Sequence, residues 1–154
     1  MKRILVGPIN LPGEFNLDPS QLINPGMGGS EFHSLVLALH LSKNFRVTIW
    51  VSNGRLEGPV PEVIYGYPSE QNFDLQICYT SNTAVGDFAR LSAVVISHHP
   101  FDDHIRTLPR RAVLIANVGK FQLLTNSGLA RKIGLEQTWL PVFLRAPNTS
   151  KVVE

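Results

Sequence analysis

Residues 24–31, which read Asn-Pro-Gly-Met-Gly-Gly-Ser-Glu, lie between an apolar stretch at residues 4–6 and a longer one at residues 32–43. The first stretch has the length of a buried strand, and the second carries apolar side chains at helical spacing. A strand, a glycine-rich loop and a helix N-terminus in this order bring free backbone N–H groups and the positive end of a helix dipole together. The order predicts a site for a phosphate or a carboxylate.

The glycine spacing differs from two common phosphate-binding motifs. It is not the G-x-G-x-x-G of dinucleotide sites, and no Gly-Lys-Ser/Thr of a P-loop follows. Gly28 and Gly29 can still bring the backbone close to a bound group, because glycine has no Cβ. We expect Ser30 to cap the helix, and we expect Glu31 to stabilise the helix while repelling a phosphate. A plain glycine turn before a capped helix is the alternative.

Further apolar stretches bounded by turn residues predict alternating strands and helices. Strands are expected at residues 3–6, 46–51, 63–65, 75–79, 93–97, 121–125 and 139–143. Helices are expected at residues 30–43, 84–90, 109–118 and 127–133, although the third segment is so apolar that it also suits a strand. The alternation predicts a single α/β domain with a Rossmann-like, doubly wound and mostly parallel sheet. The long loop at residues 7–27 is expected to be functional.

Composition narrows the class of protein. The chain has 154 residues, which suits one domain, and its formal net charge of +2 comes from scattered basic residues, so we expect no nucleic-acid partner. Its single cysteine, Cys78, lies in an apolar stretch, which excludes a disulfide framework. The apolar residues at the N-terminus are too few for a signal peptide or a transmembrane segment. We therefore expect a cytoplasmic protein.

Residues 97–104, Ser-His-His-Pro-Phe-Asp-Asp-His, follow the strand expected at residues 93–97. This places His98 and His99 at the carboxyl edge of the sheet, where ligands bind in such folds. A neutral imidazole there can accept a proton or hydrogen-bond a sugar hydroxyl. A metal site built from these histidines and the two aspartates is one alternative, although a His-x-x-x-His spacing and a cysteine partner are absent. Exposed loop histidines beside an aspartate helix cap are the other.

Taken in order, these motifs resemble the N-terminal domain of GT-B glycosyltransferases. Residues 2–6, Gly28-Gly29-Ser30-Glu31 with the helix that follows, and residues 45–50 are similar to the start of the large retaining group whose first helix begins Gly-Gly-x-Glu. The resemblance covers nearly the whole chain but only half of the family's enzyme. It implies an acceptor-side domain at residues 1–146, with residues 147–154 starting a linker or tail.

The resemblance also implies a function: transfer of a sugar from a nucleotide-sugar donor to a hydroxyl of a glycan, lipid or small molecule. His99 is similar to the histidine that contacts the reaction centre in that family, and His98 is the competing register. Gly28, Gly29 and Ser30 would touch the donor's diphosphate or transferred sugar, with Glu31 and Asn126 as further substrate-binding residues. The nucleotide would be held mainly by a C-terminal GT-B domain, so this domain alone would have little activity, and no cofactor or metal is implied.

Two other functions remain open on the sequence. A stand-alone α/β module that binds a nucleotide or a saccharide without catalysis fits the same motifs. A small single-domain enzyme that uses the histidine and aspartate cluster with a metal is also possible, but the chain has no Gly-x-Ser-x-Gly elbow, which excludes a serine hydrolase.

Overall fold

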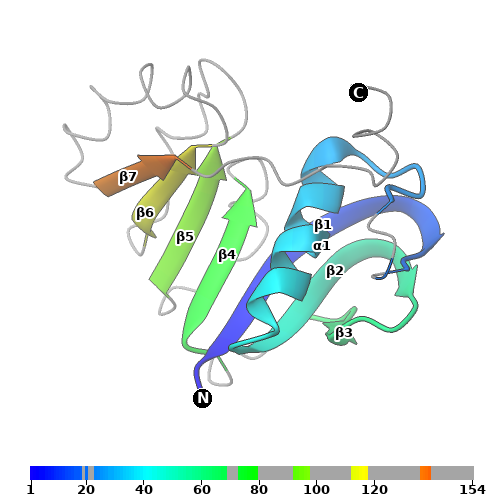
Figure 1. The fold of residues 1–154 in the computed structure, drawn as a ribbon, viewed down its shortest axis with the longest axis horizontal. Helices are drawn as coiled ribbons and strands as arrows, with labels where there is room; N and C mark the ends of the chain where they lie inside the picture. Colours follow the sequence, from blue (N-terminus) through cyan, green and yellow to red (C-terminus); the bar gives the residue numbers. More distant parts are fainter. Residues whose placement is uncertain are drawn as a thin grey trace.

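The computed structural model describes residues 1–18, 20, 23–68, 73–79, 92–97, 112–117 and 136–139. Within these ranges the chain forms one seven-stranded sheet with a helix against it (Figure 1). The elements are β1 (Arg3–Asn16), α1 (Gly29–Leu41), β2 (Arg46–Glu57), β3 (Glu62–Ile64), β4 (Leu75–Tyr79), β5 (Ser92–Ser97), β6 (Ala112–Asn117) and β7 (Glu136–Trp139).

Every neighbouring pair of strands is parallel, and the strand order is β3-β2-β1-β4-β5-β6-β7. The predicted α/β class with a parallel sheet is therefore confirmed. From β1 the chain passes through α1 to β2 and β3 on one side of the sheet, and it then crosses to β4 and the remaining strands on the other side. The order of the strands reverses between β1 and β4, and this reversal is where parallel sheets bind ligands.

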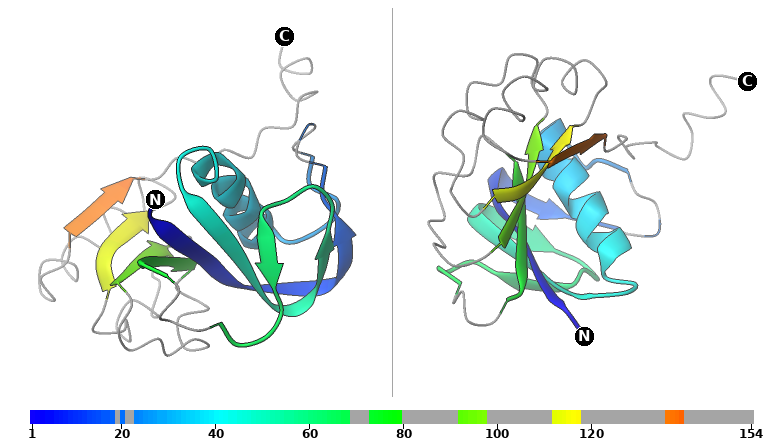
Figure 2. Two further views of the ribbon diagram at one scale, coloured as in Figure 1. Left: turned by 90° about the horizontal axis from the view of Figure 1, so that it is seen from below. Right: turned by 90° about the vertical axis from the view of Figure 1, so that its left-hand side faces the viewer.

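Both faces of the sheet carry apolar side chains, because successive residues of a strand point to opposite faces. Ile4, Val6 and Ile49 belong to a large buried cluster that includes the apolar side of α1. Leu5 and Trp50, one position along the same strands, form a smaller cluster on the other face. Figure 2 shows α1 lying against the first of these faces. Burial on both sides explains why these strands read as continuous apolar stretches.

The helix begins one residue before the predicted start and ends two before the predicted end. Gly28 is its N-cap, with extended backbone angles (φ −60°, ψ 156°) and no side-chain capping hydrogen bond. Ser30 lies two positions further on, and its hydroxyl donates to the Glu31 carboxylate at 3.1 Å. The predicted cap at Ser30 is therefore wrong. The middle of α1 is almost fully buried, including Phe32, Leu35 and Val36, whereas Gly29 in its first turn is exposed.

β1 is much longer than its predicted four residues. It continues from Arg3 to Asn16 and pairs with β2 as far as Glu57, so residues 7–16 of the loop expected at residues 7–27 are strand. Pro8 and Pro12 suggested a loop because proline cannot donate to a sheet ladder. The structure accommodates both where the register shifts, between Val6 and Ile9 and between Asn10 and Glu14. Buried Ile9 and Leu11 anchor this extension to the core.

The second half of β2 curves, so that a four-residue connection returns the chain to β3 (Figure 1). Tyr65, directly after β3, holds this curved end. Its hydroxyl donates to the Leu56 carbonyl at 2.7 Å and accepts from the Leu56 N–H at 3.1 Å. One phenol thus satisfies both backbone groups of a residue at the end of the strand, which fixes the curve.

Two further predictions need correction, and several lie outside the described residues. The helix expected at residues 109–118 is wrong, because Ala112–Asn117 forms β6 and pairs on both sides, with β5 and β7. The last described strand begins earlier than expected: Glu136–Trp139 is strand, and of the strand expected at residues 139–143 the structure describes only Trp139. Outside the described residues lie the predicted helices at 84–90 and 127–133, the predicted strand at 121–125 and the domain boundary after residue 146.

Of the helices that the structure describes, none combines the length and the apolar character needed to cross a membrane.

Candidate functional site

At the point of strand reversal lies a narrow crevice with polar and apolar walls, which in this structure has no room for a water molecule. β1 and β4 pair only through Ile4 to Val6, and the N-terminus of α1 lies beside the place where they separate. Figure 1 shows the start of α1 and the arrowheads of β4 and β5 at the same end of the sheet. We call this place the switch-point crevice, and it is lined by Pro8, Ile9, Ser30, Glu31, Ser34 and Tyr79.

One side of α1 carries polar side chains near the crevice. Ser30, His33 and Ser34 have the i, i+3, i+4 spacing that places side chains on one face. His33 and Ser34 are only 2% and 6% exposed. The Ser34 hydroxyl donates to the Ser30 carbonyl at 2.9 Å, so it is fixed within the helix. This polar stripe faces the end of β4 rather than solvent.

His33 and Tyr79 form the buried centre of the site. Nδ1 of His33 and the Tyr79 hydroxyl share a hydrogen bond, and the two rings meet edge to face at 5.9 Å between centroids. Tyr79 is the last residue of β4 and is 3% exposed. The contact joins two residues 46 positions apart, and it ties α1 to β4 across the point where the strand order reverses.

Burial sets the charge state of this pair. It lowers the pKa of His33 below the ordinary 6.5, so the imidazole is neutral at pH 7. It also raises the pKa of the Tyr79 phenol, and the nearby Glu31 carboxylate raises it further. The phenol therefore keeps its proton, and the pair can donate and accept hydrogen bonds without carrying charge.

The glycine-rich loop is held in a defined shape by Asn24. The Asn24 side-chain oxygen accepts from the N–H groups of Gly26 (2.9 Å) and Met27 (2.8 Å), and its amide donates to the Met27 carbonyl at 2.8 Å. Met27 is buried beneath the loop. Such side-chain bonds to the backbone fix the loop before any ligand arrives.

Glu31 decides which ligand suits the mouth of the crevice. Its carboxylate folds back over Gly28, where a Cβ on that glycine would collide with Oε2. A negative charge thus already occupies the positive end of the helix dipole. A phosphate at this place would be repelled by Glu31, whereas ligand hydroxyl groups can donate to it. Gly29 remains open, with no atom within 4 Å of its potential Cβ.

The predicted site residues fall into two groups. Gly28, Gly29, Ser30 and Glu31 are brought together at the start of α1, as expected. His98, His99 and Asn126 lie outside the described residues.

The described strands do place the end of β5 at the same edge as the crevice. Tyr79 is in register with Ile96, one residue before β5 ends at Ser97. Asn126 was expected to follow a strand at residues 121–125, which the structure does not describe. Asn117, which ends β6, also lies at this edge, in register with Ser97. It was not predicted as a site residue, because a helix was expected at residues 109–118.

His33, Ser34 and Tyr79 were also missed, although the sequence holds a signal for them. Two polar residues interrupt the apolar positions of the helix at the spacing of one face, and a tyrosine ends the apolar strand at residues 75–79. Polar groups that follow the burial pattern of a helix point to a buried hydrogen-bonded site.

In the described part of the chain, no three His, Cys, Asp or Glu side chains lie close enough together to hold a metal ion. The histidines and aspartates of residues 98–104 are not among the residues described. No protein-family model, curated protein or solved structure matches this chain.

The neutral state of His33 predicts that stability depends on pH. Folding lowers the pKa of His33. Its contribution to the free energy of unfolding is therefore fully present above the unfolded pKa of 6.5 and is lost as the pH falls toward the lower pKa of the folded state. The difference in thermal midpoint between wild type and His33→Gln should therefore shrink as the pH falls from about 8 to about 5. His40→Gln, at the exposed C-terminal turn of α1, is the control and should keep the wild-type profile. An equal pH profile in His33→Gln and wild type would contradict a neutral buried His33.

Proposed function

We propose that this chain is the N-terminal, acceptor-side domain of a GT-B glycosyltransferase, with a Rossmann-like, doubly wound sheet. The observation that carries the proposal is the position of the glycine loop and the start of α1, beside the reversal of strand order between β1 and β4. The described strand order contains the 3-2-1-4-5-6 order of Rossmann sheets, which bind ligands at that reversal. The resemblance of Gly28-Gly29-Ser30-Glu31 to the family's first helix points to the same place.

At the mouth of the crevice, the charge of Glu31 favours the transferred sugar over the diphosphate. Sugar hydroxyls can donate to the Glu31 carboxylate and accept from the free N–H groups of the first helical turn. Gly28 and Gly29 allow the sugar ring to approach the backbone closely. The buried pair of His33 and Tyr79 holds the start of α1 against β4 and adds no charge to the site.

We propose that His99 contacts the reaction centre, with His98 beside it. Both follow Ser97, where β5 ends at the same edge as Tyr79. A polar imidazole there would orient the acceptor hydroxyl or the transferred sugar. Negative charge develops on the leaving diphosphate in such a transfer, and preorganised donors stabilise it. In this proposal the C-terminal domain supplies most of those donors and holds the nucleotide.

The test uses the protein encoded by the complete natural reading frame. Purified protein is incubated with UDP-, GDP- and ADP-sugars and a panel of sugar, lipid and small-molecule acceptors, and release of the nucleoside diphosphate is followed. We expect one donor class to release its nucleoside diphosphate, and we expect this release to require the acceptor. Gly29→Val should reduce the release, because a branched side chain blocks the open space above that residue. Residues 1–154 alone should show little release.

Two results would contradict the proposal: no donor turnover by the complete protein, or a natural stop codon directly after residue 154. The second result would favour the alternative of a stand-alone module that binds a nucleotide or a saccharide.

A further inference from the structure

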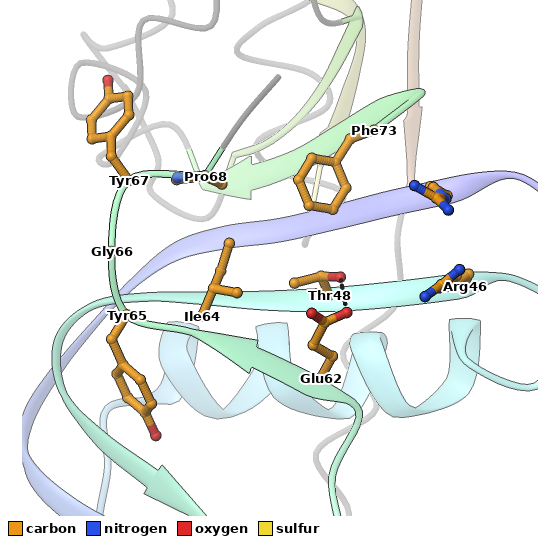
Figure 3. Close-up of a pocket in the computed structure, with 10 residues that line it drawn as sticks. Arg46, Thr48, Glu62, Ile64, Tyr65, Gly66, Tyr67, Pro68 and Phe73 are labelled. Atoms are coloured by element: carbon orange, nitrogen blue, oxygen red, sulfur yellow. Dashed lines mark hydrogen bonds between the residues drawn. The ribbon is translucent and has the colours of Figure 1, made fainter. Parts of the chain in front are cut away.

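A larger cleft lies on the face of the sheet opposite α1, as Figure 3 shows. Its volume is about 560 Å³, within the roughly 300–1,000 Å³ typical of small-molecule sites. We call it the amino-end cleft, and the side chains that matter here are Arg3, Arg46, Thr48, Glu62, Ile64 and Phe73.

The strand register explains how these side chains come together. Arg3 pairs with Arg46 across β1 and β2, and Thr48 pairs with Glu62 across β2 and β3. Alternate residues of a strand share a face, so Arg46 and Thr48 point the same way. The cleft therefore lies at the amino ends of β1, β2 and β3. The switch-point crevice lies toward the carboxyl ends, so the two sites are distinct.

One end of the cleft carries two positive charges side by side. Neighbouring strands are about 4.8 Å apart. Arg3 is the first residue of β1 and Arg46 is the first residue of β2, and both are exposed. Among the described residues neither guanidinium has an ion pair or a hydrogen bond. The Asp74 carboxylate accepts from the backbone N–H of Arg3 at 2.9 Å. Two adjacent guanidinium groups offer up to ten N–H donors, a geometry suited to the three terminal oxygens of a phosphate monoester.

The other side of the cleft is apolar. Ile64 and Phe73 are half-buried and project into the space between the strands and the loop after β3 (Figure 3). They pack against buried Leu5 and Trp50. The Phe73 ring offers a flat surface on which a planar ligand ring can stack.

The other aromatic residues of the cleft are engaged in its walls. The Tyr67 ring stands edge to face against Trp50 at 5.4 Å, and the Tyr65 hydroxyl bonds the backbone of Leu56. Figure 3 shows both tyrosine rings pointing away from the centre. Phe73 is therefore the aromatic surface left for a ligand.

Glu62 lies between the charged and the apolar parts. The Thr48 hydroxyl donates to Glu62 Oε2 at 3.3 Å, which orients the carboxylate within the cleft. A carboxylate in this position can accept a hydrogen bond from a ligand hydroxyl or amine.

We propose that the amino-end cleft binds a phosphate monoester that carries a planar ring, of the class of nucleoside monophosphates. The phosphate lies on Arg3 and Arg46, the ring lies against Phe73 and Ile64, and Glu62 accepts from a hydroxyl between them. This site is independent of the sugar-transfer proposal, because it shares no residue with the switch-point crevice.

The test is calorimetric titration of the 154-residue chain with AMP, adenosine and inorganic phosphate. AMP should bind at least about 10-fold more tightly than either fragment, since only AMP engages both parts of the cleft. The double variant Arg3→Gln and Arg46→Gln should weaken AMP binding by about 10-fold or more. The matched control is Lys43→Gln with Arg55→Gln, which removes the same charge elsewhere and should leave AMP binding unchanged.

A second pair of measurements keeps the proposal testable if the double variant does not fold. Phe73→Leu should weaken the binding of AMP and leave the binding of inorganic phosphate unchanged. In wild type, raising salt from about 50 to about 500 mM should weaken AMP more than adenosine, because ions screen exposed charges.

Three outcomes would overturn the proposal. Equal affinity for AMP and phosphate would show that the ring of AMP does not contact Phe73 and Ile64. AMP binding that survives loss of both arginines but is lost in Gly29→Val would move the ligand to the glycine loop. No saturable binding of AMP up to about 10 mM, a concentration at which even millimolar affinity is detectable, would reject the site.

Discussion

Replacing His99 by alanine is expected to lower the turnover of the complete transferase by about 10²- to 10⁴-fold, the usual contribution of a side chain that moves or orients a proton at a reaction centre. The expectation follows from the end of β5 at Ser97, at the edge of the sheet where Tyr79 and the start of α1 form the switch-point crevice. Initial rates at saturating donor and acceptor measure the effect. The thermal midpoint should shift little, since the residue serves the substrate.

Two variants make the His99 result specific. His98→Ala tests the neighbouring register, and the larger loss of turnover identifies the residue at the reaction centre. His40→Ala, in the last turn of α1 at the opposite end of the helix, should retain full turnover. If His99→Ala retains wild-type turnover, that residue does not belong to the site.

The second large effect concerns the fold. Gly7→Ala should lower the free energy of unfolding by about 3–5 kcal/mol, combining a disfavoured backbone angle with a steric collision. Gly7 has φ +132°, which residues with a Cβ rarely adopt, and a Cβ there would collide with the Trp50 carbonyl oxygen. That oxygen belongs to the backbone of β2 and cannot swing aside. The Gly7 carbonyl also accepts a buried hydrogen bond from Gln76 at 2.8 Å, which fixes its position.

Urea unfolding measures this loss against a natural stability of about 5–15 kcal/mol for a small domain. Gly13→Ala is the matched control in the same strand. No atom lies within 4 Å of its potential Cβ, so its stability should stay within about 0.5 kcal/mol of wild type. Equal stability of the Gly7 and Gly13 variants would contradict the close approach of β1 and β2 at Gly7.

Local sequence was sufficient where one periodicity dominated. The apolar spacing of α1 predicted that helix to within one or two residues, and the stretch at 75–79 predicted β4 with the observed bounds. It failed for β6, because a run of apolar residues has no period that separates strand from helix. Pairing with β5 and β7 on both sides decides that segment, and this information lies outside it.

Only the part of the site that a local sequence pattern contains was predicted. Gly28, Gly29 and Glu31 lie within four consecutive residues, so their grouping at a helix start could be read directly. The contact of His33 with Tyr79 depends on α1 and β4 meeting beside the strand reversal, which no local pattern contains. β1 was predicted too short because its prolines suggest a loop, and only the shifted register of the β1 and β2 pair shows how a strand accommodates them.

Gly29 and His99 should flank one crevice, and a cross-link between them tests this directly. β4 alone separates β1 from β5, so the two positions should lie within the reach of a bis-maleimide of about 10–15 Å. The native Cys78 is buried, so Gly29→Cys with His99→Cys should react cleanly and give an intramolecular product by mass spectrometry. The control pair Arg3→Cys with His99→Cys spans the length of the sheet and should remain unlinked. Linkage of the control pair without linkage of Gly29 to His99 would place the histidine at the wrong edge and contradict the proposed site.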